Sequence, residues 1–172
     1  LGEVPIYNGN EIDYANYIEK NFDNPNLTTY MLPFKVVTKY SNEIGNYPTI
    51  DIDFFKKIND TYGHNCGDQV LKSLSDLFRE KTLGAGHVCR WGGEEFLFFF
   101  PEMNLDNAAT LMNEINIAVS KCIISYKDIT IHVTMTFGVE ENDFQSSISD
   151  IVKRADDKLY YGKTHGRDTV IS

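Results

Sequence analysis

Residues 90–100 read Arg-Trp-Gly-Gly-Glu-Glu-Phe-Leu-Phe-Phe-Phe, two β-type runs separated by a pair of glycines. Gly92 and Gly93 predict a tight two-residue hairpin turn, because both can take φ > 0 without a Cβ clash. Two adjacent acids, Glu94 and Glu95, then enter an apolar strand, and neighbouring strand residues point to opposite faces. Taken alone, the stretch is compatible with a charged surface turn or with a carboxylate held for metal binding or catalysis.

The chain has 172 residues, of which 42% are hydrophobic and 13% aromatic, as in a single globular domain with a proper core. It contains neither a run of eighteen apolar residues nor the pattern of a signal peptide, so we expect this segment to make no membrane contact. The chain does not begin with Met, which indicates a piece of a longer protein.

A formal charge of −9 disfavours a protein that binds a nucleic-acid polymer, since such proteins carry basic surfaces. Three cysteines, Cys66, Cys89 and Cys122, are odd in number and lack the spacing of a metal site. They predict reduced thiols and a cytoplasmic setting. An acidic protein can still bind a phosphorylated small molecule where basic residues and a divalent cation converge.

Hydrophobic periodicity predicts an α+β fold with a ferredoxin-like βαββαβ core, an antiparallel sheet with surrounding helices. We expect residues 1–48 to form an N-terminal helix and lead-in, and residues 49–172 to form the functional domain. The expected elements are a helix over 10–22, a candidate strand over 30–37, a strand over 49–52, helices after 54 and from 67, strands over 87–91 and 96–100, a helix over 106–122, a strand over 129–139, a helix over 147–161 and a closing strand over 169–171.

In this topology the first and third core strands are central, so Asp51 at the end of one lies beside the hairpin tip that carries Glu94. Two carboxylates at one sheet edge suit Mg²⁺, which takes a few oxygen ligands plus substrate phosphates, and Asp53 is expected to supply another oxygen nearby. Two such ions suit phosphoryl transfer. The helix after Phe54 would direct free backbone N–H groups at the phosphates.

Four motifs stand in order along the chain: Asp51-Ile52-Asp53-Phe54-Phe55-Lys56-x-x-Asn59-Asp60-x-x-Gly63-His64-x-x-Gly67-Asp68, Arg90-Trp91-Gly92-Gly93-Glu94-Glu95-Phe96, Arg154-Ala155-Asp156-x-x-Leu159-Tyr160, and Lys163-x-x-Gly166-Arg167. Together they closely resemble the GGDEF family of diguanylate cyclases over about residues 49–172, here with a Gly-Gly-Glu-Glu-Phe signature.

The resemblance implies a cyclase-like, palm-related fold that condenses two GTP molecules into cyclic di-GMP and releases pyrophosphate. It implies two Mg²⁺ ions per half-site, with Mn²⁺ as an alternative, and a transient or signal-driven homodimer. It also implies a sensory domain before this segment in the parent protein, which can be tethered to a membrane.

The resemblance further assigns a role to each matching position. The implied metal ligands are Asp51, the backbone carbonyl of Ile52 and Glu94; the implied catalytic residues are Glu94, Glu95 and Lys56; the implied phosphate contacts are Phe54, Phe55, Lys56, Lys163 and Arg167; the implied guanine contacts are Asn59 and Asp68; and Gly92 and Gly93 form the turn. A carboxylate at position 68 accepts from the N1–H and 2-amino groups of guanine, which adenine lacks, and family members with Ser there relax the choice.

The chain departs from the family in two places. An inhibitory Arg-x-x-Asp pair would fall at Leu83 and Gly86, so this product-binding site is expected to be absent. The usual opening pattern of the domain matches 1–9 only at Ile6 and Asn8.

Three hypotheses of different classes follow. The first is a Mg²⁺-dependent diguanylate cyclase. The second is a catalytically silent module that binds GTP and regulates a partner. The third is an acidic ferredoxin-like interaction domain, which would require the whole set of motifs to be accidental. Intact signature, phosphate and base-reading residues favour the first.

Overall fold

A six-stranded sheet lies at the centre of the protein, whose computed structural model describes residues 45–143 and 145–172. The expected helix over 10–22 and the candidate strand over 30–37 lie outside the described residues. The strands are β1 (Gly45–Asn46), β2 (Thr49–Ile52), β3 (His87–Arg90), β4 (Glu95–Pro101), β5 (Ile124–Tyr126), β6 (Ile129–Ile131), β7 (Met135–Gly138) and β8 (Val170–Ile171). The helices are α3 (Phe55–Tyr62), α4 (His64–Thr82), α5 (Leu105–Lys121) and α6 (Ile148–Thr164).

Strand pairing confirms the ferredoxin-like order. β2 pairs antiparallel with β4 on one side and with β7 on the other, and β3 pairs with β4 as a hairpin. The first and third core strands, β2 and β4, are therefore central, as expected. β1 adds to β4, and β8 runs parallel to β7.

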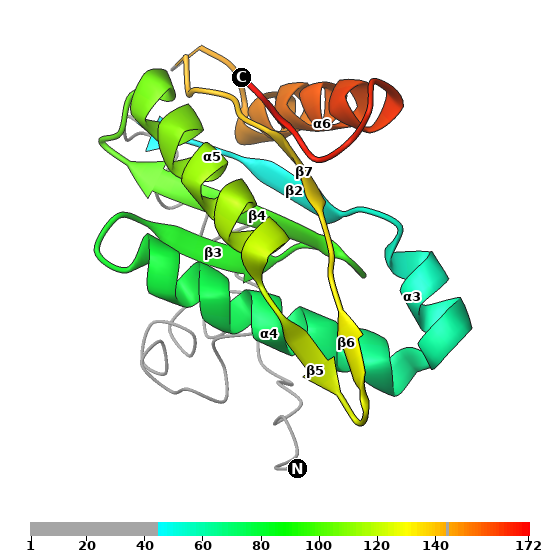
Figure 1. Cartoon of the computed structure of the whole chain (residues 1–172). Coiled ribbons are helices and arrows are strands. Elements are labelled where there is room, and N and C mark those ends of the chain that lie inside the picture. The colour runs from blue at the N-terminus through cyan, green and yellow to red at the C-terminus, as the bar shows by residue number, and fades with distance from the viewer. Residues whose placement is uncertain (1–44, 144) are drawn as a thin grey trace, which may run out of the picture.

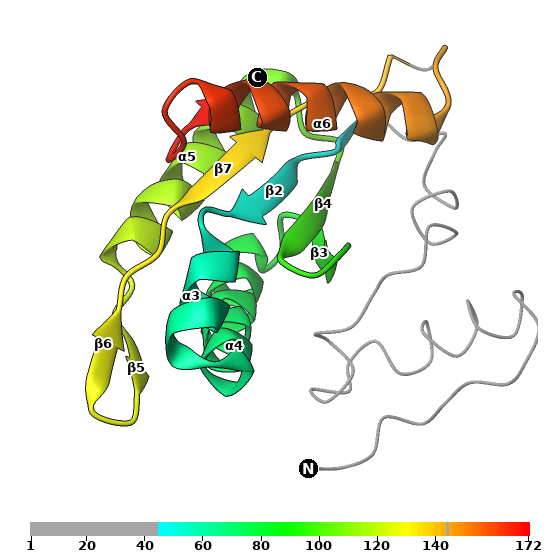
Figure 2. The same cartoon turned by 90° about the vertical axis from the view of Figure 1, so that its right-hand side faces the viewer.

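Helices cover both faces of the sheet (Figures 1 and 2). α4 and α5 pack on one face and share the larger hydrophobic cluster with the sheet, whereas α6 packs on the other face, where Ile151 and Val152 join the smaller cluster. α3 continues from the end of β2. None of the helices in the described ranges combines the length and apolar character needed to cross a bilayer.

The apolar run of β4 follows from this two-sided burial, because a strand covered on both faces needs no polar alternation. Phe96 and Phe98 face α4, where the Phe78 ring meets them edge-on at centroid distances of 5.0 and 5.3 Å. Leu97 and Phe99 belong to the cluster under α6.

The expected single strand over 129–139 is wrong, since the structure divides it into β6 and β7. β6 pairs with β5 in a separate two-stranded sheet, and β7 pairs with β2. The side-chain alternation persists across the break, with Ile131, Val133 and Met135 all buried. Periodicity therefore reported burial correctly but did not reveal the change of partner strand.

α4 also begins earlier than the expected start near Gly67. Gly63 ends α3 with φ of 84°, and its carbonyl oxygen accepts from the backbone N–H groups of Cys66 and Gly67. α4 therefore starts at His64, directly after this glycine and three residues before the expected start. All three cysteines are free thiols, as expected.

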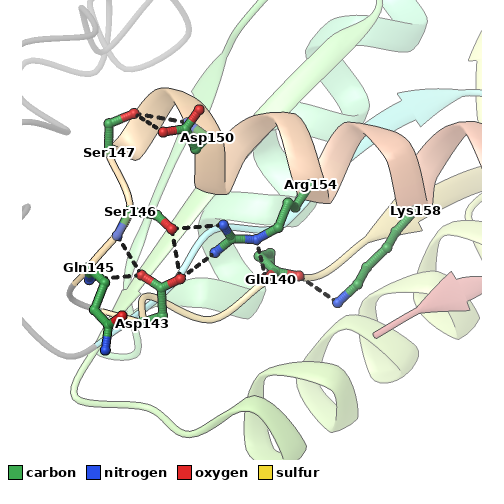
Figure 3. A network of polar contacts seen from close by, with 8 residues as sticks. All are labelled: Glu140, Asp143, Gln145, Ser146, Ser147, Asp150, Arg154 and Lys158. Atoms are coloured by element: carbon green, nitrogen blue, oxygen red, sulfur yellow. Dashed lines mark hydrogen bonds and ion pairs between the residues drawn. The ribbon is translucent and has the colours of Figure 1, made fainter.

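A network of charged groups anchors α6 to the segment after β7 (Figure 3). The Glu140 carboxylate accepts from Arg154 Nε at 2.6 Å and from Lys158 Nζ at 2.7 Å. Burial tends to raise the pKa of Glu140, but the Lys158 and Arg154 hydrogen bonds and charges outweigh it and leave that pKa lowered. The Ser146 hydroxyl, followed by the backbone N–H groups of Ser146 and Gln145, lowers the pKa of Asp143 to about 2.

Replacing Glu140 with Gln is expected to lower the free energy of unfolding by about 1–3 kcal/mol at pH 7, because two charge-assisted hydrogen bonds weaken. Since folding lowers the pKa of Glu140, its contribution is fully present above about pH 5 and is lost as the pH falls through the folded-state value. Urea unfolding of the two proteins should therefore differ at pH 7 and converge in acid. Glu114→Gln, an exposed change on α5, is the matched control, and an equal effect of both variants would contradict the assignment.

Candidate active site

The glycine turn between β3 and β4 is longer than expected. Arg90 is the last residue of β3 to pair, opposite Phe96, and the backbone N–H groups of Trp91 and Gly92 both donate to the Glu95 carbonyl oxygen. Neither Gly92 nor Gly93 has a left-handed φ, so the prediction of a two-residue turn with positive φ is wrong.

The close approach of a neighbouring side chain explains why position 92 is a glycine. A Cβ at Gly92 would overlap the Glu95 carboxylate, whereas a Cβ at Gly93 would meet no described atom within 4 Å. The Arg90 guanidinium fixes the turn by donating to the carbonyl oxygens of both glycines at 2.6–3.1 Å. Hydrogen bonds from Arg90 thus stabilise the hairpin tip, and the space next to Gly93 is open.

Asp51 lies near the end of the central strand β2, on the sheet face that α6 covers. Its Oδ2 atom accepts from Lys163 Nζ of α6 at 2.7 Å, and its side chain is only 10% exposed. Burial raises the pKa of Asp51 more than the hydrogen bond and charge of Lys163 lower it. A desolvated carboxylate of this kind requires a cation, and Lys163 supplies one here.

The strand register brings Glu95 to the same face, because Asp51 and Glu95 are direct partners across β2 and β4. The Glu95 charge also raises the pKa of Asp51. Glu94 precedes the first residue of β4, and its carbonyl oxygen accepts from the Ile52 N–H at 3.3 Å. Both signature acids therefore flank the end of β2, with Glu95 in direct register and Glu94 at the turn.

Asp53 was expected to offer a further metal oxygen, and the structure disfavours that role. Its side chain is fully buried, and both oxygens are already hydrogen-bonded. Thr136 Oγ1 donates to Oδ1 at 2.7 Å, and Thr134 Oγ1 donates to Oδ2 at 2.8 Å. This carboxylate is thus held against β7, and its charge adds to the burial and to the Glu95 charge that raise the pKa of the nearby Asp51.

The start of α3 meets the requirements of a phosphate site. Phe54 precedes the helix with φ of 58°, a strained conformation for a residue with a Cβ, and no side chain caps the helix. The first backbone N–H groups of a helix have no intrahelical acceptor and favour an anion. Lys56 is exposed in this first turn, and the Arg167 guanidinium lies over the exposed Phe54 ring at 4.5 Å.

The two residues expected to read the base come from neighbouring helices. Asn59 of α3 packs against Gly67 of α4, where any Cβ would overlap Asn59 Oδ1. That oxygen is buried and has no hydrogen-bond partner among the described residues. Asp68 follows Gly67 directly and is exposed. The structure thus brings an amide oxygen and a carboxylate into one region, and neither has a partner among the described residues.

The protein groups at the end of β2 fit a cation that shares its ligands with a substrate. Within the described residues, no set of three or more His, Cys, Asp or Glu side chains is grouped closely enough to hold a metal ion alone. Mg²⁺ is held in proteins by one or two carboxylates plus waters and phosphates, so a buried Asp51 beside a second acid is sufficient. That Lys163 already neutralises Asp51 supports a cation at this place.

A groove of about 460 Å³ lies between α3 and the segment 130–134. Its lining includes Asp53, Phe54, Lys57 and His132, but not the expected ligands Asp51 and Glu94 or the expected guanine contacts Asn59 and Asp68. The end of β2 that carries Asp51 is therefore distinct from this groove, although Asp53 and Phe54 line the groove and lie beside that site.

Several residues of the site were not expected from the sequence. Thr134 and Thr136 alternate with apolar residues in the expected strand over 129–139, a pattern typical of a solvent-facing side, yet their hydroxyls bind Asp53. Phe54 was expected to contribute only its backbone N–H group, but its ring also contacts the Arg167 guanidinium. The alternation of threonines was a visible signal, but the sequence gives no sign that they face a buried carboxylate.

Comparison with known proteins adds independent evidence. Residues 44–169 match the family model described as "Diguanylate cyclase, GGDEF domain". The chain is 40% identical over 123 residues to diguanylate cyclase DgcM of Escherichia coli, which covers 72% of this chain and 29% of that protein. The chain thus spans less than a third of the length of that curated relative.

Two solved structures are also similar. The GGDEF domain of DgcB from Caulobacter crescentus, determined in complex with c-di-GMP, superposes with a TM-score of 0.72 at 29% identity and covers 80% of this chain and 81% of its own. The active GGEEF domain of a diguanylate cyclase from Vibrio cholerae gives a TM-score of 0.69 at 30% identity, over 80% and 87% of the two chains.

Proposed function

Because the chain belongs to the GGDEF domain family, we propose that it is a diguanylate cyclase, a nucleotidyltransferase that joins two GTP molecules into cyclic di-GMP. The observation that carries the proposal is the meeting of Asp51, Lys163 and the signature hairpin at one end of the central strand. These are a carboxylate, an ammonium cation and a glycine turn with open space, which is what a metal–triphosphate complex requires.

In the proposed reaction, the 3′-hydroxyl oxygen of one GTP bonds to the α-phosphorus of the other, and the bond to pyrophosphate breaks. The hydroxyl proton is lost to the surrounding solvent or base, and a second, equivalent step closes the ring. Bound Mg²⁺, or Mn²⁺, at two positions per half-site would activate the hydroxyl and neutralise the charge on the phosphates. Asp51, Glu94 and the Ile52 carbonyl are the proposed ligands, with Glu95 as the acid opposite Asp51.

The remaining residues hold the nucleotide. Lys163, which neutralises Asp51 in the nucleotide-free protein, is proposed to turn to the triphosphate together with Arg167 when a metal takes its place. The backbone N–H groups of Phe54 and Phe55 and the side chain of Lys56 would receive further phosphate oxygens at the start of α3.

Base selection is proposed to lie between α3 and α4. The Asn59 amide, whose Oδ1 is buried against Gly67 and has no hydrogen-bond partner among the described residues, is proposed to turn to the guanine edge, and the exposed Asp68 carboxylate can accept two donors of that edge. Adenine presents no matching pair of donors on that edge. GTP is therefore the proposed substrate in preference to ATP.

Positions 83 and 86 support the proposal that the Arg-x-x-Asp inhibitory site is lacking. Leu83 is 84% exposed and carries no charge. A Cβ at Gly86 would overlap the Phe99 backbone, so the structure has no room there for an acid. Micromolar binding of cyclic di-GMP at these positions would contradict this part of the proposal.

The reaction needs two domains, because each holds one GTP and the two must face each other. Below the dimerisation constant, the rate of cyclic di-GMP formation per domain should rise roughly tenfold for each tenfold increase in protein concentration, by mass action. Initial rates over a dilution series, at saturating GTP and Mg²⁺, test this. A rate per domain that is measurable and independent of concentration would contradict a transient homodimer.

The second candidate is a silent GTP-binding module that regulates a partner domain. Such a module would make the same guanine and phosphate contacts as the cyclase and would differ only in not converting GTP to product. The intact signature acids disfavour it. Tight GTP binding without product, under conditions where the protein dimerises, would favour it over the cyclase.

A further inference from the structure

Asp53 has no role in the proposed chemistry, yet it is among the most constrained side chains near the site. Its carboxylate is fully buried and accepts hydrogen bonds from Thr134, Thr136 and the backbone N–H of Asp168. The Asp168 bond reaches Oδ2 at 3.1 Å and spans 115 positions of the chain. Asp53 thus ties the end of β2 both to the β7 segment and to the turn after α6.

The turn after α6 is strained and needs such a support. Gly166, Arg167 and Asp168 have consecutive φ values of 124°, 62° and 47°. Left-handed conformations cost on the order of 1–2 kcal/mol for each residue that carries a Cβ, so Arg167 and Asp168 adopt them only when other contacts impose them. The Arg167 N–H donates to the Gly162 carbonyl at 2.9 Å, and the Asp168 N–H donates to Asp53.

Arg167 is positioned as a result. Its Nε atom lies 4.0 Å from Asp53 Oδ1, and its guanidinium lies over the Phe54 ring at 4.5 Å. The side chain remains 39% exposed, so one side of the guanidinium is free to meet a ligand. In Figure 1 the red segment after α6 runs beside β7, close to where β2 leads into α3.

From these contacts we infer that Asp53 is a positioning residue for the triphosphate: it fixes the 166–168 turn and holds Arg167 over Phe54, ready to bind phosphate. The inference rests on the proposed function, because it assumes that Arg167 meets the nucleotide. It differs from a metal-ligand role, which the three hydrogen bonds to the Asp53 oxygens oppose. A buried carboxylate with an adjacent guanidinium orders the cation before the ligand arrives, which strengthens binding.

Asp53→Asn is the sharpest variant, because the amide keeps the shape of the side chain. Its oxygen can continue to accept from Asp168 and Thr134, while its nitrogen faces Thr136 and Arg167 as a donor without charge. The ligand is 3′-deoxy-GTP with Mg²⁺, which lacks the attacking hydroxyl and so reports binding without turnover. GMP, which lacks the β- and γ-phosphates, is the comparison ligand.

Calorimetry should give about a tenfold weaker Kd of Asp53→Asn for 3′-deoxy-GTP and an unchanged Kd for GMP, since only the clamp on the outer phosphates is disturbed. Arg167→Ala should show the same pattern, and adding Asp53→Asn to it should change the Kd less than about twofold, because the two residues act as one unit. Glu140→Gln weakens the attachment of α6 without touching the site, so it is the control for an effect of stability. It should leave the Kd values for GMP and 3′-deoxy-GTP unchanged.

The outcomes separate the inference from the proposed function. Equal loss of GMP and 3′-deoxy-GTP binding, or additive effects of Asp53→Asn and Arg167→Ala, would overturn the positioning role and leave the nucleotide site standing. No binding of 3′-deoxy-GTP by the unaltered protein would overturn both. If Asp53→Asn does not fold, NMR relaxation of the Arg167 Nε–H in the unaltered, nucleotide-free protein decides: an ordered side chain supports the inference, and an order parameter below about 0.6 contradicts it.

Discussion

Replacing Asp51 with Asn is expected to lower the rate of cyclic di-GMP formation about a hundredfold or more, because the change removes a charged metal ligand. Asp51 is buried at the end of β2, and its only described ion-pair partner is Lys163. An amide at this place binds Mg²⁺ poorly and no longer offsets the Lys163 charge. The measurement is the initial rate at saturating GTP and Mg²⁺, with circular dichroism to establish that the variant is folded.

Comparison of the two signature acids sharpens this result. Glu95 is the direct register partner of Asp51, whereas Glu94 is the ligand that the family resemblance implies. If Glu94→Gln lowers the rate as much as Asp51→Asn does, and Glu95→Gln lowers it less, Glu94 is the metal ligand. If Glu95→Gln lowers the rate more than Glu94→Gln, the metal ligand is Glu95. Asp106→Asn, on the exposed first turn of α5, should leave the rate unchanged. An Asp51→Asn variant with more than half of the original rate would contradict the metal site.

Replacing Asp68 with Ser should change base selection rather than chemistry. The ratio of kcat/KM for GTP to that for ATP is expected to fall about 10- to 100-fold, because the carboxylate no longer accepts from the guanine N1–H and 2-amino groups. Asp68 is exposed at the start of α4, next to Gly67 and the buried Asn59 amide, so the change should disturb no packing.

The matched control for this prediction is Asp76→Ser. Asp76 lies on the same helix, is 58% exposed and contacts only Arg79 among its described ion-pair partners, at 3.4 Å. It should leave the GTP-to-ATP ratio unchanged. The same ratio in Asp68→Ser and in the unaltered protein would contradict a role of Asp68 in reading guanine.

Much of the fold was predictable because its determinants are local. The alternation of apolar residues and the helical spacing after Asp51 predict the order of elements, and the chirality and connection rules for sheets then place β2 and β4 at the centre. The nearness of Asp51 to the signature hairpin follows from that order. The hydrophobic pattern does not determine the register of β2 against β4. The structure shows that Glu95, and not Glu94, lies opposite Asp51.

The remaining features depend on contacts between distant segments. Asp53 reads as one member of an Asp-x-Asp pair, and no local property shows that Thr134, Thr136 and Asp168 surround it. The break between β6 and β7 likewise depends on distant partners, because β6 pairs with β5 and β7 pairs with β2 although the sequence alternates without a break. Glycines at 92 and 93 predict a turn, but the Arg90 hydrogen bonds to their carbonyl oxygens determine its shape.

The most direct test of the proposed function is incubation of the concentrated protein with GTP and Mg²⁺, followed by mass spectrometry, with Glu94→Gln in parallel. The proposed function predicts cyclic di-GMP and pyrophosphate from the unaltered protein and intact GTP from the variant. GTP that is bound but left intact by the unaltered protein, at concentrations where two domains associate, would contradict a cyclase.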